Sequence, residues 1–171
     1  MASFGVSNPR WEISRRAVVI DSNVLIAAFR ERDQWHDVAS AFLDEPELYQ
    51  DSPDQLVVPS AVVVESWGFL VGRDRRPDLG YRLLDWLTTP GRALILPEWD
   101  RLLQMGHDLC RTAQIDVVDG VLFSLAHLIT DELGLASPLR VATLDTRDYT
   151  KCTRRFGLRV RLLDLRSDET Y

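Results

Sequence analysis

The feature that most constrains this fold is the alternation of short apolar runs with longer amphipathic segments. Four largely apolar runs, at residues 17–20, 56–58, 93–96 and 139–144, have the length and bounding residues of strands, and residues 159–163 form a fifth with an alternating pattern. Helical periodicity lies between them, at residues 24–30, 36–43, 61–71, 79–87, 98–112 and 117–133. Such alternation is typical of a mostly parallel sheet with helices on both faces. The sequence therefore predicts an α/β fold, a three-layer α/β/α sandwich around a five-stranded sheet.

Two residues predict where helices begin or end. Ser60 is expected to cap the N-terminus of the third helix, and Gly134 to follow the C-terminus of the last one. The chain has 171 residues, which suits one domain over residues 17–166. Residues 1–16 are expected to form an N-terminal extension, residues 167–171 a tail, and residues 72–77 a loop. With no long apolar run and no apolar signal-peptide core, a cytoplasmic protein without membrane contact is expected.

Charge and missing motifs exclude several classes of protein. A net charge of −6 argues against a protein that coats nucleic acid by bulk charge, although local arginine patches could still bind phosphate. No glycine-rich nucleotide-binding motif and no GxSxG motif occur, so a nucleotide cofactor or a serine hydrolase is not expected. Cys110 and Cys152 lie outside any metal-binding pattern and are expected to be reduced thiols. The three histidines also lack ligand spacing.

Acidic residues follow two of the predicted strands directly. Asp21 ends the first strand and Asp145 ends the fourth. Ligand sites of open parallel sheets form at the carboxyl ends of strands, so these two side chains converge if the strands are neighbours. Glu65 and Asp119 lie in helical segments that are otherwise apolar.

A carboxylate in an apolar setting needs a partner, because burying an unpaired charge is costly. One divalent cation can serve several acids, and oxygen ligands suit Mg²⁺ or Mn²⁺. Such an ion lowers the pKa of bound water and stabilises charge on a phosphodiester. The sequence thus predicts a metal-dependent nuclease site built from Asp21, Glu65, Asp119 and Asp145.

Each of these acids also has a simpler interpretation as a helix cap or an ion-pair partner. Asp116 is either an acid favoured by the N-terminal helix dipole or a member of the site. Asp148 is expected to support the site from outside or to cap locally. The basic residues after Asp145 either steer RNA phosphates or form a solvated helix face; they include Arg147, Lys151, Arg154 and Arg155.

Four segments in order resemble the motifs of the PIN-domain family of ribonucleases, and most closely those of VapC-type toxins. The segments are IDSNVLI, VPSAVVVESWGFL, VDGVLFSLA and ATLDTRDY, and the resemblance spans about residues 17 to 163. It implies a strand order of 3-2-1-4-5 and assigns the catalytic acids to Asp21, Glu65, Asp119 and Asp145. It also implies hydrogen-bonding support from Ser22, Asn23 and Thr143.

The resemblance further implies a Mg²⁺- or Mn²⁺-dependent endoribonuclease that acts as a toxin, with an RNA substrate, a protein antitoxin and a homodimeric state. Asp21, Asp119 and Asp145 would hold the metal, and Glu65 would join them or orient the attacking water. The chain departs from the pattern where Phe123 and Ser124 replace the usual small alanines, and in an additional stretch at residues 72–80. Two alternatives stay open: a housekeeping RNA or DNA nuclease of the same fold, and a non-catalytic binding module.

Overall fold

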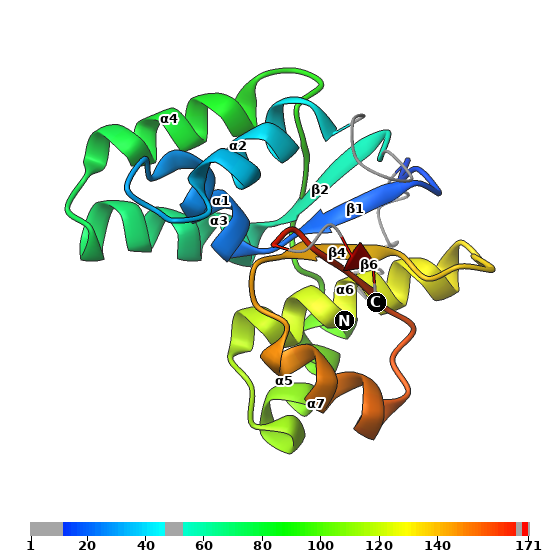
Figure 1. The fold of residues 1–171 in the computed structure, drawn as a ribbon. Coiled ribbons are helices and arrows are strands. Elements are labelled where there is room, and N and C mark those ends of the chain that lie inside the picture. The colour runs from blue at the N-terminus through cyan, green and yellow to red at the C-terminus, as the bar shows by residue number, and fades with distance from the viewer. Residues whose placement is uncertain (1–11, 47–52, 167–168, 171) are drawn as a thin grey trace, which may run out of the picture.

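The computed structural model describes residues 12–46, 53–166 and 169–170 (Figure 1). Its sheet contains the strands β1 (Ala17–Ile20), β2 (Gln55–Pro59), β3 (Leu94–Leu96), β4 (Arg140–Thr143), β5 (Arg161–Asp164) and β6 (Glu169–Thr170). Their order is β3-β2-β1-β4-β5-β6, and the first five strands run parallel. The predicted order 3-2-1-4-5 is therefore confirmed. The short antiparallel strand β6, paired with β5, was not predicted.

Helices cover both faces of this sheet. They are α1 (Ser22–Phe29), α2 (His36–Asp44), α3 (Ser60–Trp67), η2 (Gly68–Arg73), α4 (Pro77–Thr88), α5 (Asp100–Ala113), α6 (Val117–Glu132) and α7 (Arg147–Phe156). Figure 1 shows α1 to α4 on one side of the sheet and α5 to α7 on the other. None of these helices is both long and apolar enough to span a lipid bilayer.

The central strands β1 and β4 are buried along their whole length. They pair in register, with Val19 opposite Val141 and Ile20 opposite Ala142. Burial on both faces explains why the interior of these strands is apolar rather than alternating; β4 has polar residues only at its two ends, Arg140 and Thr143. Because both strands end at the same edge of the sheet, the residues that follow them, Asp21 and Asp145, emerge side by side.

The start of α3 differs from the prediction. Ser60 is the first residue of the helix, not its N-cap; that position belongs to Pro59, whose backbone is extended. The hydroxyl of Ser60 and the backbone N–H of Ala61 both donate to the carboxylate of Glu98, which lies far along the chain. A distant acid thus satisfies the N-terminal groups of α3, a contact that local sequence could not reveal.

The end of this helical region also differs from the prediction. Gly72 and Arg73, expected in a loop, belong to the π-helix η2, whose wider turn is continued by a hydrogen bond of 2.8 Å from the backbone N–H of Asp74 to the carbonyl of Phe69. The Arg73 guanidinium lies 5.3 Å from the centre of the Phe69 ring, a contact that stabilises the added turn. At the end of α6 the prediction is confirmed, because Gly134 has a φ of 58° there.

Candidate active site

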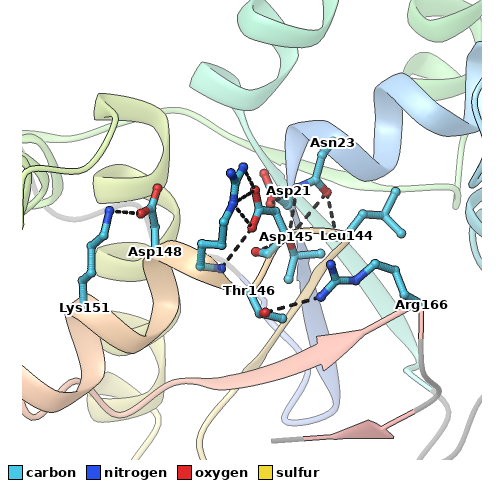
Figure 2. Close-up of polar contacts among 10 residues, drawn as sticks. Asp21, Asn23, Leu144, Asp145, Thr146, Asp148, Lys151 and Arg166 are labelled. Carbon is cyan, nitrogen blue, oxygen red and sulfur yellow. Dashed lines mark hydrogen bonds and ion pairs between the residues drawn. The ribbon is translucent and has the colours of Figure 1, made fainter.

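Asp21 lies between β1 and α1, where a capping role was the simplest interpretation. It occupies the N-cap position, yet its side chain makes no capping hydrogen bond. Its Oδ2 instead accepts hydrogen bonds from Asn23 Nδ2 at 2.7 Å and from Thr143 Oγ1 at 2.6 Å (Figure 2). The carboxylate is therefore oriented by polar side chains rather than used to begin the helix.

The same polar groups connect the ends of β1 and β4. Asn23 Oδ1 accepts from the backbone N–H of Leu144 at 2.9 Å, and Thr143 Oγ1 accepts from that of Asp145 at 2.9 Å. The side chain of Ser22 makes a longer contact, of 3.4 Å, with Asp21 Oδ1. Asn23 and Thr143 thus occupy the positions expected of supporting residues, and Ser22 makes a weaker contact.

A cavity of about 170 Å³ lies next to this network, at the carboxyl edge of the sheet. Six carboxylates line it, together with the polar residues Ser22 and Asn23 and the apolar residues Val118 and Phe123. The six acids are Asp21, Glu65, Asp116, Asp119, Asp145 and Asp148. The structure therefore gathers the four acids predicted from the sequence, and both acids whose membership was open, around one cavity.

Burial and negative charge change the protonation of two of these acids. Burial raises the pKa of Asp21 from 3.8 to about 6; the negative charge of Glu65 adds to this rise, and hydrogen bonds from Thr143 and Ser22 oppose it. Burial likewise raises the pKa of Asp119 to about 7, and the charges of Asp21, Asp148, Asp116 and Glu65 add to the rise. The cavity therefore holds more negative charge than its own groups compensate.

Asp145 lies in a different electrostatic environment. The guanidinium of Arg147 forms hydrogen bonds with both of its carboxylate oxygens, with Nε 2.9 Å from Oδ1 and 2.8 Å from Oδ2 (Figure 2). These hydrogen bonds hold the pKa of Asp145 below its ordinary value. Lys151 pairs in a similar way with Asp148. The side chain of Arg154, a third expected RNA contact, lies outside the described residues.

Asp116 has a local helix-terminal role of the expected kind, whereas Asp148 forms an ion pair that was not expected. Asp116 is the N-cap of α6, and its Oδ1 accepts from the backbone N–H of Val118 at 2.9 Å. Asp148 lies in the first turn of α7 and pairs with Lys151. Because both also line the cavity, a capping or pairing role and a place in the site coexist in these residues.

The oxygen ligands around the cavity are of the type that binds a hard divalent cation, but they are not arranged as a complete set of ligands. Carboxylate and amide oxygens are the ligands that Mg²⁺ and Mn²⁺ prefer, and the raised pKa values of Asp21 and Asp119 reflect charge that a cation would offset. Within the described part of the chain, however, no three His, Cys, Asp or Glu side chains are placed to hold one ion together. The Arg147 guanidinium also contacts both carboxylate oxygens of Asp145, so a cation bound there would have to displace it.

Two residues near the site were not among the predicted ones. Asp164 is the last residue of β5, a position similar to those of Asp21 after β1 and Asp145 after β4. Its side chain is buried, and the residue is 4% exposed. Arg166 pairs with Asp164 and donates to Thr146 Oγ1 at 3.3 Å (Figure 2). The signal for Asp164 was present in the sequence, as an acid at the end of an apolar strand. Arg166 gave no comparable signal, since its contact with Thr146 depends on the pairing of β4 with β5.

Several solved structures have the same fold. Mycobacterium tuberculosis VapC20, described as a sarcin-ricin loop cleaving toxin, superimposes with a TM-score of 0.60 at 13% identity over 78% of this chain and 93% of that one. VapBC2 from Rickettsia felis, bound to a DNA fragment from its promoter, gives 0.56 at 12% identity, over 85% and 98%. A toxin–antitoxin complex from Klebsiella pneumoniae gives 0.54 at 18% identity, over 77% and 89%.

Comparison of the sequence identifies the family, which structural similarity at this low identity does not. No curated protein is matched by this chain at a significant level. The family model described as PIN domain matches residues 18–151, which include every acid that lines the cavity. Since this match covers most of the chain and the strand order agrees, the chain belongs to the PIN domain family.

Proposed function

We propose that this protein is a metal-dependent endoribonuclease and the toxin of a toxin–antitoxin pair. The observation that carries the proposal is the convergence of six carboxylates on one cavity at the carboxyl edge of a parallel sheet. No lysine, arginine or histidine is among the described residues that line this cavity. Arg147 and Lys151 pair with Asp145 and Asp148 from outside the lining. Crowding of the remaining acids around one space is expensive unless a cation shares their charge, which favours metal binding over a purely structural role.

In this proposal Asp21, Asp119 and Asp145 hold Mg²⁺ or Mn²⁺, and Glu65 or Asp116 completes the set or orients the attacking water. A bound cation would activate water and offset the charge that develops on the phosphodiester. Asn23 and Thr143 fix the Asp21 carboxylate through the hydrogen bonds at 2.7 and 2.6 Å. Arg147 and Lys151 lie on α7 beside the cavity, where they would contact RNA phosphates.

Two of the similar solved structures support the proposal of an RNA substrate and a toxin role. One structural neighbour is described as a toxin that cleaves the sarcin-ricin loop, and another as a toxin–antitoxin complex. We extend these properties to this chain as part of the proposal, together with a protein antitoxin as partner. A homodimer and a cytoplasmic location stay predictions.

The substitution Asp21→Asn tests the catalytic proposal. It removes the charge of a carboxylate that is 6% exposed while keeping its size and its contact with Thr143. We expect cleavage of an RNA substrate in Mg²⁺ or Mn²⁺ to fall by about a thousandfold or more, the scale on which single active-site groups act. Asp85→Asn, at an exposed position on α4, is the matched control and should cleave normally.

Wild-type cleavage rates in Asp21→Asn, or cleavage that survives chelation of all divalent cations, would refute the proposal. The toxin role needs a separate measurement in cells. Expression of the wild type should arrest growth, a small protein encoded next to it should restore growth, and Asp21→Asn should be harmless. Nuclease activity without growth arrest would instead favour a housekeeping nuclease of the same fold.

A further inference from the structure

A second cavity lies at the opposite edge of the sheet, where the parallel strands begin. Its volume is about 290 Å³, and four arginines line it: Arg15, Arg16, Arg140 and Arg161. Arg15 and Arg16 precede β1, while Arg140 and Arg161 are the first residues of β4 and β5. No aspartate or glutamate is among the described residues that line this cavity.

The pairing of β4 with β5 brings two of these arginines together. Arg140 and Arg161 are directly opposite each other in the ladder, so their side chains leave the sheet on the same face. Arg140 is only 7% exposed, whereas Arg161 is half-buried. An anion between the two guanidinium groups would accept hydrogen bonds from both of them.

The donors around the cavity suit one kind of anion. A guanidinium group presents a planar set of N–H donors that matches phosphate oxygens in a two-pronged contact. Ser137, also in the lining, adds a hydroxyl, to which Arg161 Nη1 donates at 3.2 Å. Several guanidinium groups and a hydroxyl surround one space. A phosphate group can accept more hydrogen bonds from them than a carboxylate can, because it has more oxygens and carries up to two negative charges.

We propose that this arginine cavity, lined by Arg15, Arg16, Arg140 and Arg161, is a binding site for a phosphate group. The phosphate belongs either to the backbone of RNA or to a small phosphate compound. The RNA source rests on the proposed function, because it makes the cavity a second contact for the substrate at the sheet edge opposite the carboxylates. The small-phosphate source is independent of nuclease activity.

A binding experiment without catalysis tests this site. Wild-type protein in chelator-containing buffer is titrated with inorganic phosphate and pyrophosphate while the arginine Nε–Hε resonances are followed by NMR. A single-stranded RNA oligonucleotide is titrated separately by fluorescence anisotropy at several salt concentrations. Because no metal is present, the outcome does not depend on cleavage, so failure of the proposed function leaves this test intact.

The double variant Arg15→Gln/Arg161→Gln removes two donors that are not fully buried and leaves Arg140 in place. The control Arg32→Gln/Arg111→Gln removes the same charge from two exposed positions outside the cavity. We expect the double variant to weaken phosphate or pyrophosphate binding about tenfold or more, while the control binds as the wild type does. Thermal unfolding of each variant establishes that the fold is kept.

The RNA titration distinguishes the two sources. If RNA is the ligand, the double variant loses about tenfold in affinity and its salt dependence decreases by about two ions, one per lost phosphate contact. If RNA binding is unchanged while phosphate binding is lost, the ligand is a small phosphate. If neither ligand distinguishes the double variant from the control, the proposed site is wrong.

Discussion

At the scale of single residues, the same three-residue arrangement occurs at the ends of two neighbouring strands. Asp145 and Asp164 each accept a hydrogen bond of 3.0 Å from the backbone N–H two residues later and pair with the guanidinium of that residue, Arg147 or Arg166. The two acids differ in surroundings, because Asp145 lines the acidic cavity and Asp164 does not. Arg147 therefore covers one of the proposed metal ligands.

Removal of this guanidinium should make Asp145 available to a cation. In Arg147→Ala we expect Mn²⁺ to bind roughly tenfold more tightly in isothermal titration, because a metal would no longer displace an ion pair. RNA should bind more weakly to the same variant if Arg147 contacts phosphate. Arg111→Ala, at an exposed position on α5, is the control and should change neither affinity. Unchanged Mn²⁺ affinity in Arg147→Ala would show that the arginine does not compete with the ion.

At the scale of elements, the close packing of α5 against α6 positions Asp119. A side-chain atom added at Gly120 would lie 2.5 Å from Cys110 Sγ and 2.7 Å from the backbone oxygen of Gly106. The backbones of the two helices therefore approach at Gly120, one residue after Asp119. This contact was not predicted from the sequence, since a glycine inside a helical pattern has no single meaning.

The substitution Gly120→Ala should force α5 and α6 apart. We expect the free energy of unfolding to fall by about 1–3 kcal/mol, as is usual for an overpacked contact. Metal binding should weaken as well, because Asp119 moves with the helix.

Gly68→Ala is the matched control. Gly68 lies in a helical region with a φ of −58°, and no neighbouring atom lies within 4 Å of the added carbon. The control should be neutral or stabilised by up to about 1 kcal/mol. Urea denaturation of both variants measures the difference, and equal effects would contradict this account of the helix contact.

At the scale of the whole molecule, opposite charges collect at opposite edges of one sheet. The acidic cavity lies where the parallel strands end, and the arginine cavity lies where they begin. Crowding of like charge costs stability at the acidic cavity, where the pKa values of Asp21 and Asp119 are raised. This distribution also explains how a chain with a net charge of −6 can bind phosphate, because a local concentration of arginine matters more there than the total charge.

The acidic edge should make metal-free protein less stable at neutral pH than in mild acid. The pKa values of Asp21 and Asp119 are raised to about 6 and about 7, so ionising either group costs more in the folded than in the unfolded chain. Their penalty is present above these values and disappears as pH falls towards the unfolded value of about 4. We expect the melting temperature without metal to rise as pH is lowered from 8 to 5.

The variant Asp119→Asn isolates this contribution. At pH 8 without metal it should be more stable than the wild type, by on the order of 1 kcal/mol, and should lose most of the dependence on pH. Added Mg²⁺ should stabilise the wild type and not the variant. Scanning calorimetry across this pH range measures all three effects. A variant that is less stable than the wild type at pH 8 would show that Asp119 is held by favourable contacts rather than crowded by its neighbours.

The sequence by itself determined the layers of this fold and two positions of the candidate site. Largely apolar runs followed by an acid revealed β1 and β4, because the middle of a strand buried on both faces favours apolar residues. Asp21 and Asp145 were therefore found without knowledge of the fold. Asp164 also follows the apolar residues of a strand, β5, but it was not among the predicted site residues. The apolar frame of their helices singled out Glu65 and Asp119, and the resemblance to the PIN-domain motifs supplied their roles and the preference for Asp119 over Asp116.

Only the tertiary structure decided what these residues contact. Glu98 satisfies the start of α3, Arg147 covers Asp145, and Arg140 lies opposite Arg161, and none of these relations can be read from the sequence alone. The pairing of Arg140 with its neighbour Arg161 depends on strand order and register. The contact between Arg147 and Asp145 depends on the direction of the side chains after the end of β4. The physical reason is that periodicity reports which face of an element is buried, whereas the partner on that face depends on how distant segments pack together.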